Sequence, residues 1–229
     1  MKILVTAGST RVMIDKVRAI SNIFGGRTGT KLALDLGLKG NNVTLLTSSP
    51  NLFKMMEAEI SKGYDYRKNV VLVVYKTYED LAETLEREVK IGQYDVIIHS
   101  SAVSDYEVEG VYYLDSEGNR VRVDNSSKIP SGMKMFIELQ PTEKLIDKIR
   151  EPWGFTGKLI KFKLQADMSE KDLISIAVKS RQISHSDFIV ANCLEWMLQD
   201  DQVLLIDRDD VVERVNRVDL GKLLYRRLK

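Results

Sequence analysis

The sequence predicts an α/β protein with a Rossmann-like, mostly parallel sheet, helices on both faces and a protruding β-hairpin or flap. In the first half of the chain, short apolar runs of strand length alternate with amphipathic segments of helix length, as in parallel βα units. Several runs end in small or polar residues, which is typical of the carboxyl edge of a sheet. The rhythm then breaks at a polar, hairpin-like stretch. We expect one domain over residues 1–229, with the flap at roughly 111–132.

The first unit is predicted as strand, loop, helix and strand. Lys2–Ala7 reads as a buried strand because its apolar run stops at turn-forming residues. A glycine patch, Gly25–Gly29, then precedes Lys31–Lys39, where leucine and alanine recur at near-helical spacing. Asn42–Thr47 follows as the second strand. This unit would bring the glycine patch to the sheet's carboxyl edge.

The later elements follow from the same two criteria, apolar β-rich runs for strands and four-residue apolar spacing for helices. Further helices are predicted at Asn51–Lys62, Thr77–Lys90, Pro141–Arg150, Ser169–Ile183 and Leu220–Leu228. Further strands are predicted at Val70–Tyr75, Asp95–His99, Lys134–Leu139, Leu159–Leu164 and Asp187–Ala191, with Gln202–Asp207 and Val211–Arg217 as an antiparallel pair. The flap consists of the hairpin Val111–Asp115 and Arg120–Asp124 and the loop Asn125–Gly132.

Composition narrows the class of protein. A formal net charge of +1, with acidic and basic residues interspersed, argues against nucleic acid as a partner. No apolar run approaches the ~20 residues of a membrane span, and no signal segment opens the chain. Cys193 is the single cysteine, and His99 and His185 lie far apart, so neither an intramolecular disulfide nor a zinc cluster is predicted. We expect a cytoplasmic protein without a membrane partner.

The glycine patch suggests a phosphate cradle. Glycines let a phosphate approach the backbone N–H groups at a helix N-terminus, and Arg27 adds a charged donor. An alternative is that Gly25, Gly26 and Gly29 only permit a tight loop and close helix packing. Neither a G-x-G-x-x-G after the first strand nor a P-loop sequence is present.

A second loop of small residues, Ser100–Tyr106, follows the fourth strand and should lie beside the glycine patch. Its small side chains leave room for a flat or extended ligand. Asp105 would accept hydrogen bonds from a sugar hydroxyl or a base amine, or alternatively cap a turn.

Together, seven stretches in order resemble the phosphopantothenoylcysteine synthetase family of coenzyme A biosynthesis. They are Val5–Thr6–Ala7–Gly8, Asp15 with Val17–Arg18, Ile20–Ser21–Asn22, Gly26–Arg27–x–Gly29, Ala102–Val103–Ser104–Asp105–Tyr106, Phe162–Lys163–Leu164 and Val190–Ala191–Asn192. The chain starts at the synthetase domain itself and so resembles the stand-alone form. The flap reads Lys128–Ile129–Pro130–Ser131 where many bacterial members are lysine-rich.

The resemblance implies a ligase that joins 4′-phosphopantothenate to cysteine through an acyl-nucleotidylate, with CTP or ATP as co-substrate and Mg²⁺. It leaves open the choice of nucleotide and the lysine that touches its phosphates. It also implies a homodimer, in which an arm of one subunit helps to cover its neighbour's site.

The resemblance also implies roles for individual residues. Asn22 would be the catalytic residue, binding the activated acyl group. The nucleotide would be bound by Gly8, Gly26, Gly29, Ser101, Asp105, Phe162 and Asn192, with Lys128 and Lys179 as further candidates. The substrate would be bound by Arg18, Asn22, Arg27 and Ala102.

Two other functions stay open. An NAD(P)-dependent reductase would use the opening unit for a dinucleotide, although the usual glycine fingerprint is missing. A non-catalytic nucleotide-binding module would keep the fold and lose the reaction, and the altered flap favours it. Retention of Asn22, Asp105, Phe162 and Asn192 favours the ligase.

Overall fold

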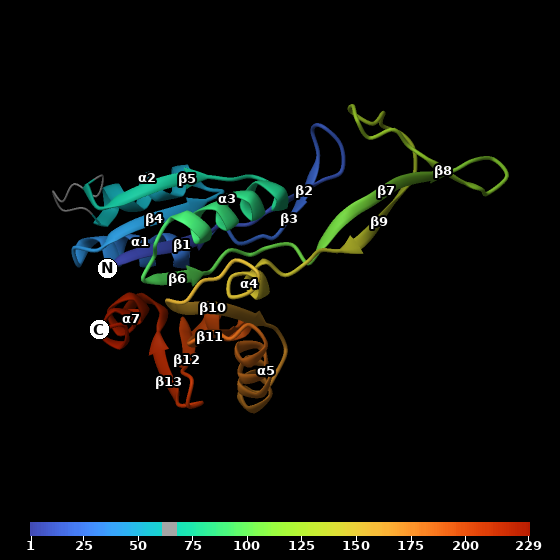
Figure 1. Ribbon diagram of the computed structural model, residues 1–229. Coiled ribbons are helices and arrows are strands. Elements are labelled where there is room, and N and C mark those ends of the chain that lie inside the picture. Colours follow the sequence, from blue (N-terminus) through green and yellow to red (C-terminus); the bar gives the residue numbers. More distant parts are fainter. Residues whose placement is uncertain (61–67) are drawn as a thin grey trace.

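A computed structural model describes residues 1–60 and 68–229 and confirms a Rossmann-like, mostly parallel sheet (Figure 1). The sheet has eight strands in the order β13-β12-β11-β10-β6-β1-β4-β5. Their bounds are β1 Lys2–Ala7, β4 Asn42–Thr47, β5 Val70–Val74, β6 Val96–His99, β10 Lys158–Gln165, β11 Phe188–Cys193, β12 Gln202–Ile206 and β13 Val212–Asn216. All neighbouring pairs are parallel except those that β12 makes with β11 and β13. The antiparallel pair of β12 and β13 was predicted, whereas that of β11 and β12 was not.

Helices cover both faces of this sheet. Their bounds are α1 Arg27–Leu38, α2 Pro50–Ile60, α3 Tyr78–Ile91, α4 Leu145–Lys148, α5 Glu170–Ile183, α6 Leu194–Gln199 and α7 Leu220–Arg227. Successive residues of a strand point to opposite faces, so Ile3 and Val5 pack with α1, α2 and α7, whereas Leu4 packs with α3 and α4. Helix α5 packs with α6, β11 and β12 in a third cluster.

The direction in which successive strands are added to the sheet reverses between β1 and β6. From β1 the chain builds outward through β4 and β5 and then returns to pair β6 with the other side of β1. In open parallel sheets, the crevice outside the carboxyl ends of two such strands is where ligands bind.

A second, three-stranded antiparallel sheet projects away from the main one as an arm (Figure 1). It contains β7 Tyr106–Leu114, β8 Arg120–Arg122 and β9 Met135–Pro141. The protruding hairpin was predicted, but its first strand begins at Tyr106 rather than Val111 and β9 belongs to it. A small hairpin of β2 Arg11–Met13 and β3 Ala19–Ser21 and the helix α6 were not predicted.

Two predicted helices have other bounds in the structure. The helix predicted over Pro141–Arg150 is wrong at its start, because Pro141 ends β9 and the helical turn covers Leu145–Lys148. Thr142 keeps the chain extended there, since its N–H donates to the Asp105 carbonyl and its hydroxyl to the Ser104 carbonyl. Helix α1 starts at Arg27 rather than Lys31. The end of the second helix predicted at Lys62 lies outside the described residues.

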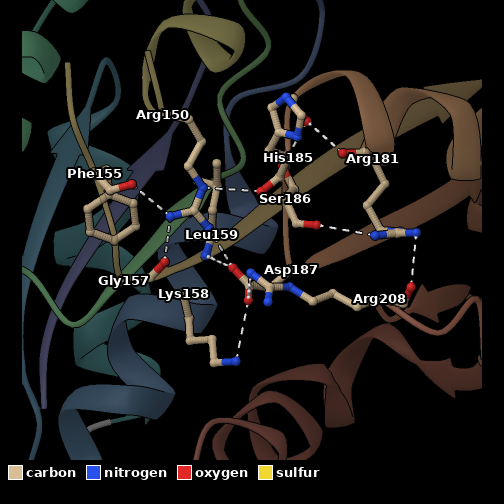
Figure 2. Close-up of polar contacts among 11 residues, drawn as sticks. Arg150, Phe155, Gly157, Lys158, Leu159, Arg181, His185, Ser186, Asp187 and Arg208 are labelled. Carbon is tan, nitrogen blue, oxygen red and sulfur yellow. Dashed lines mark hydrogen bonds and ion pairs between the residues drawn. The ribbon is translucent and has the colours of Figure 1, made fainter. Parts of the chain in front are cut away.

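The amino ends of β10 and β11 are joined by an ion-pair cluster around Asp187 (Figure 2). The Asp187 carboxylate is 2% exposed and accepts the Leu159 N–H at 2.8 Å and an Arg150 N–H at 2.7 Å. Lys158 and Arg208 lie at 3.3 and 2.8 Å from its other oxygen. The cluster holds the sheet edge opposite the carboxyl ends of β1 and β6.

Candidate active site

A cavity of about 340 Å³ opens at the carboxyl ends of β1 and β6, where strand order predicts a ligand site. Two loops, the start of α1 and two later strands meet there. The cavity is lined by residues 24–29, 99–105, 142–146 and 161–164, with Gly8, Ser180, Asn192, Met197 and Arg217.

The glycines at the start of α1 are required by close approach. Gly26 precedes the helix with φ +87°, and a Cβ built on it would lie 2.1 Å from the Gly8 nitrogen. A Cβ on Gly29 would lie 2.8 Å from the Ala7 Cβ. The packing explanation therefore holds for Gly26 and Gly29, and this packing brings the N-terminus of α1 to the cavity wall; a Cβ on Gly25 would meet nothing within 4 Å. The first N–H groups of an α-helix have no acceptor within the helix, so they are available to an anion here.

Hydrogen bonds join the loop after β6 to the loop after β1. Ala102 donates its N–H to the Gly8 carbonyl at 2.8 Å, and Ser104 donates its N–H to the Thr10 hydroxyl at 2.9 Å. The buried Tyr75 hydroxyl donates to the Ala7 carbonyl and lies 2.9 Å from the Ser101 hydroxyl. Burial raises the pKa of Tyr75 to about 12, so it acts as a fixed neutral donor. The cavity walls are thus held before any ligand binds.

The floor carries a polar row, Thr6, His99 and Lys161, on adjacent strands β1, β6 and β10. The Thr6 hydroxyl accepts the N–H groups of Ser100 and Ser101, each at 3.2 Å, so its own hydrogen is donated to His99 Nδ1 at 3.0 Å. Burial and the nearby Lys161 charge lower the pKa of His99 to about 4. His99 is therefore neutral, and Nε2 carries its proton.

Lys161 donates one hydrogen bond to the Ser180 carbonyl at 2.9 Å, and burial lowers its pKa to about 8. Sequence reasoning missed both His99 and Lys161. The available signal was a charged residue inside an apolar strand and a histidine at the end of another.

Most of the predicted site residues meet at this cavity. Those that line it are Gly8, Gly26, Arg27, Gly29, Ser101, Ala102, Asp105, Phe162 and Asn192. Asn22 is exposed and lies beside the lining, with its side-chain amide donating to the Ala102 carbonyl at 3.2 Å. Lys179 is exposed on α5, next to the lining residue Ser180, and does not itself line the cavity.

Arg18 and Lys128 lie away from the cavity, at a latch between the β2–β3 hairpin and the arm loop. The buried Asp15 carboxylate accepts the Ile129 N–H at 3.1 Å, and Arg18 donates to the Ile129 carbonyl at 2.8 Å. Asn125 also donates to the Ile14 carbonyl. In this structure, Arg18 therefore contacts the arm loop that carries Lys128.

The cavity concentrates positive charge that the whole chain lacks. Its lining includes the cationic side chains Arg27, Lys144, Lys161, Lys163 and Arg217. Asp105 and Glu143 are the acidic side chains among the same lining residues. With a net charge of +1 over all 229 residues, this surplus is local and favours an anionic ligand.

Comparison with known proteins agrees with this picture. A family model described as the DNA/pantothenate metabolism flavoprotein C-terminal domain matches residues 1–226. The chain belongs to this family. The match confirms the resemblance to phosphopantothenoylcysteine synthetases that the sequence motifs predicted.

Relatives of this family member are known from sequence and structure. The coenzyme A biosynthesis bifunctional protein CoaBC of Thermococcus kodakarensis is 32% identical over 98% of this chain and 50% of its own length. The chain thus spans about half the length of the curated relatives it matches. A crystal structure of the DNA/pantothenate metabolism flavoprotein from Streptococcus pneumoniae is 27% identical, covers 100% of this chain and 98% of that one, and has a TM-score of 0.81.

A third solved structure shares the fold. The Cab2 mutant H337A in complex with phosphopantothenate-cysteine is 16% identical over 99% of this chain and 86% of its own, with a TM-score of 0.74.

Within residues 1–60 and 68–229, no helix is long and apolar enough to cross a membrane. In the same part of the chain, no group of three or more histidine, cysteine or acidic residues is placed to hold a metal ion.

Proposed function

We propose that this protein is a phosphopantothenate–cysteine ligase. The observation that carries the proposal is a cation-rich cavity, at the switch between β1 and β6, formed by the motifs that mark the family. The curated relatives are named for coenzyme A biosynthesis, and a protein of the same fold was solved with phosphopantothenate-cysteine. A ligase of this kind brings two polyanions together, which the local positive charge offsets.

The reaction has two steps. A carboxylate oxygen of 4′-phosphopantothenate attacks the α-phosphorus of the nucleotide, and the bond to pyrophosphate breaks. The cysteine amine then attacks the acyl carbon, the nucleoside monophosphate leaves, and the amine proton passes to solvent or to a basic group. The N-terminus of α1 and Arg27 would stabilise the negative charge that grows on the phosphate oxygens in the first step.

We propose CTP or ATP as the nucleotide, together with Mg²⁺. Mg²⁺ commonly uses one or two carboxylates and completes its shell with substrate phosphates and water. Asp105 and Glu143 fit that requirement, since both line the cavity. When bound, the ion would neutralise phosphate charge.

Asn22 is the residue we propose to contact the activated acyl group. Its amide already donates to the Ala102 carbonyl at the cavity rim, so a small rotation would turn the same donor to a ligand oxygen. In Asn22→Asp, a carboxylate oxygen replaces the donor and faces that carbonyl. Loss of such a donor typically lowers kcat by about 10²–10³-fold. Asn51→Asp, at an exposed position on α2, is the matched control, and unchanged turnover of the Asn22 variant would remove the assignment.

The proposed activity is tested by pyrophosphate release with 4′-phosphopantothenate, cysteine and Mg²⁺, run in parallel with CTP and ATP. Release that depends on phosphopantothenate is the expected result. The faster nucleotide identifies the co-substrate. No release with either nucleotide would contradict the ligase and leave a nucleotide-binding module.

We also propose that the protein is a homodimer whose arm covers the neighbouring subunit's site. The arm projects from the main sheet (Figure 1). It exposes large apolar side chains on β9, namely Phe136, Ile137 and Leu139. Burying such a surface favours association. Analytical ultracentrifugation should show a dimer at assay concentrations, and a fully active monomer would contradict the proposal.

A further inference from the structure

Lys161 is a buried cation that forms no ion pair within the described part of the chain. The residue is 6% exposed and lines the cavity floor. Its ammonium group has three donor hydrogens, and the structure gives it one hydrogen bond, to the neutral Ser180 carbonyl. A buried charge is normally paired, because an unpaired one is costly to remove from water. The missing partner therefore points to a ligand.

The neighbours of Lys161 reinforce this inference. His99 lies beside it in register on β6, and the Thr6 hydroxyl holds His99 Nδ1 as an acceptor. The Nε2–H donor is therefore directed away from Thr6, in a residue that lines the cavity. A neutral His99 places no second positive charge beside Lys161, and its Nε2–H is a further hydrogen-bond donor for an anion. The cavity floor thus offers N–H donors to whatever occupies it.

We propose that Lys161 is an additional anion-binding residue, which binds a phosphate oxygen at the cavity floor with the Nε2–H of His99 beside it. The proposal rests on the proposed function, because a phosphate group enters this cavity in two substrates. Either the nucleotide's polyphosphate or the 4′-phosphate of phosphopantothenate supplies the same chemistry. Five cationic side chains in the lining make the cavity attractive to both.

Titration behaviour agrees with an unpaired lysine. Burial is the main cause that lowers the pKa of Lys161 to about 8; the charge of Asp147 opposes this lowering, and the charges of Lys163 and Lys144 add to it. His99 faces it from β6 and the Ser180 carbonyl faces it from α5. A bound phosphate would supply the missing negative charge and keep the ammonium protonated. Perturbed groups of this kind in a cleft are typical of functional sites.

The test compares Lys161→Met, Lys161→Arg and a control, Lys171→Met, which removes an exposed lysine on α5. Calorimetric titration with inorganic pyrophosphate, with CTP or ATP, and separately with 4′-phosphopantothenate measures the affinity of each variant. We expect Lys161→Met to weaken the binding of one phosphate source by about tenfold or more, and Lys171→Met to leave it unchanged. Lys161→Arg should recover part of the loss because it keeps the charge.

The probe whose binding weakens identifies the source of the phosphate. Loss toward pyrophosphate and nucleotide assigns the lysine to the polyphosphate, whereas loss toward phosphopantothenate alone assigns it to the substrate phosphate. Unchanged affinity for all probes would overturn the proposal.

The outcome is separable from the ligase assay. If the wild-type protein forms product and Lys161→Met binds every probe normally, the inference fails while the function stands. If no product forms but Lys161→Met still loses phosphate affinity, the site stands without the function. Thermal unfolding of the free proteins excludes loss of fold as the cause, because removing an unpaired buried charge should not lower Tm.

Discussion

Replacing Lys161 by methionine should stabilise the free protein at neutral pH. Burial lowers the pKa of this lysine from its ordinary value of 10.5 to about 8. At roughly 1.4 kcal/mol per pH unit, that lowering corresponds to about 3 kcal/mol of folding free energy lost at pH 7. Methionine is unbranched like lysine but one atom shorter, and it loses the hydrogen bond to the Ser180 carbonyl, which offsets about 1 kcal/mol. We therefore expect a net gain of about 2 kcal/mol in the free energy of unfolding.

Urea denaturation at pH 7 and at pH 10 measures the effect and its sign. Between pH 8 and 10.5 the unfolded chain binds the lysine proton more tightly than the folded one, so wild-type stability attributable to Lys161 rises with pH. The advantage of Lys161→Met should accordingly shrink as pH rises. Lys171→Met should show no such trend. A Lys161→Met variant that is less stable than wild type at pH 7, or whose advantage is independent of pH, would refute the reasoning.

Three further predictions concern other parts of the molecule. Gly26→Ala should destabilise the fold by at least about 1–2 kcal/mol and abolish nucleotide binding, because φ of Gly26 is +87° and the new Cβ would meet the Gly8 nitrogen. Unchanged urea unfolding and an unchanged calorimetric affinity for the nucleotide would contradict this prediction. Asp187→Ala should lower the free energy of unfolding by about 3 kcal/mol, because Arg150 loses its buried partner, and a change below about 1 kcal/mol in urea denaturation would argue against it. His99 has its pKa lowered to about 4, so its contribution to stability is complete above pH 6.5 and is lost as pH falls toward 4, by up to about 3 kcal/mol. Urea denaturation at pH 7 and 4.5 should show this loss in wild type and a smaller one in His99→Asn.

The sequence predicted those parts of the fold that local patterns determine. Apolar runs located the parallel strands, and the helices predicted to begin at Thr77 and Ser169 do begin there, because both side chains act as N-caps. The glycine patch and the loop after β6 were placed together because the carboxyl ends of parallel strands share an edge. The predicted site residues of those two loops therefore line one cavity, and their roles stay predictions.

The remaining features depend on contacts between distant residues. Pro141 reads as a helix start, yet pairing with Tyr106 makes it the end of β9. The row of Thr6, His99 and Lys161 forms only when β1, β6 and β10 align in register, which no single stretch encodes. Arg18 lies in a family motif, but whether it meets a ligand or the arm loop depends on how that loop folds back.

The latch at Asp15 gives the arm a mechanical connection to the cavity rim. The segment that starts at Asp15 holds the arm loop through Ile129 and ends, seven residues later, at Asn22, which touches Ala102. One short segment thus contacts the arm loop at its first residue and the cavity rim at its last. Three hydrogen bonds join the arm loop to residues 14–18, and the backbone from there to Asn22 reaches the rim without entering the main sheet. We therefore expect substitutions in the arm loop to alter the position of Asn22.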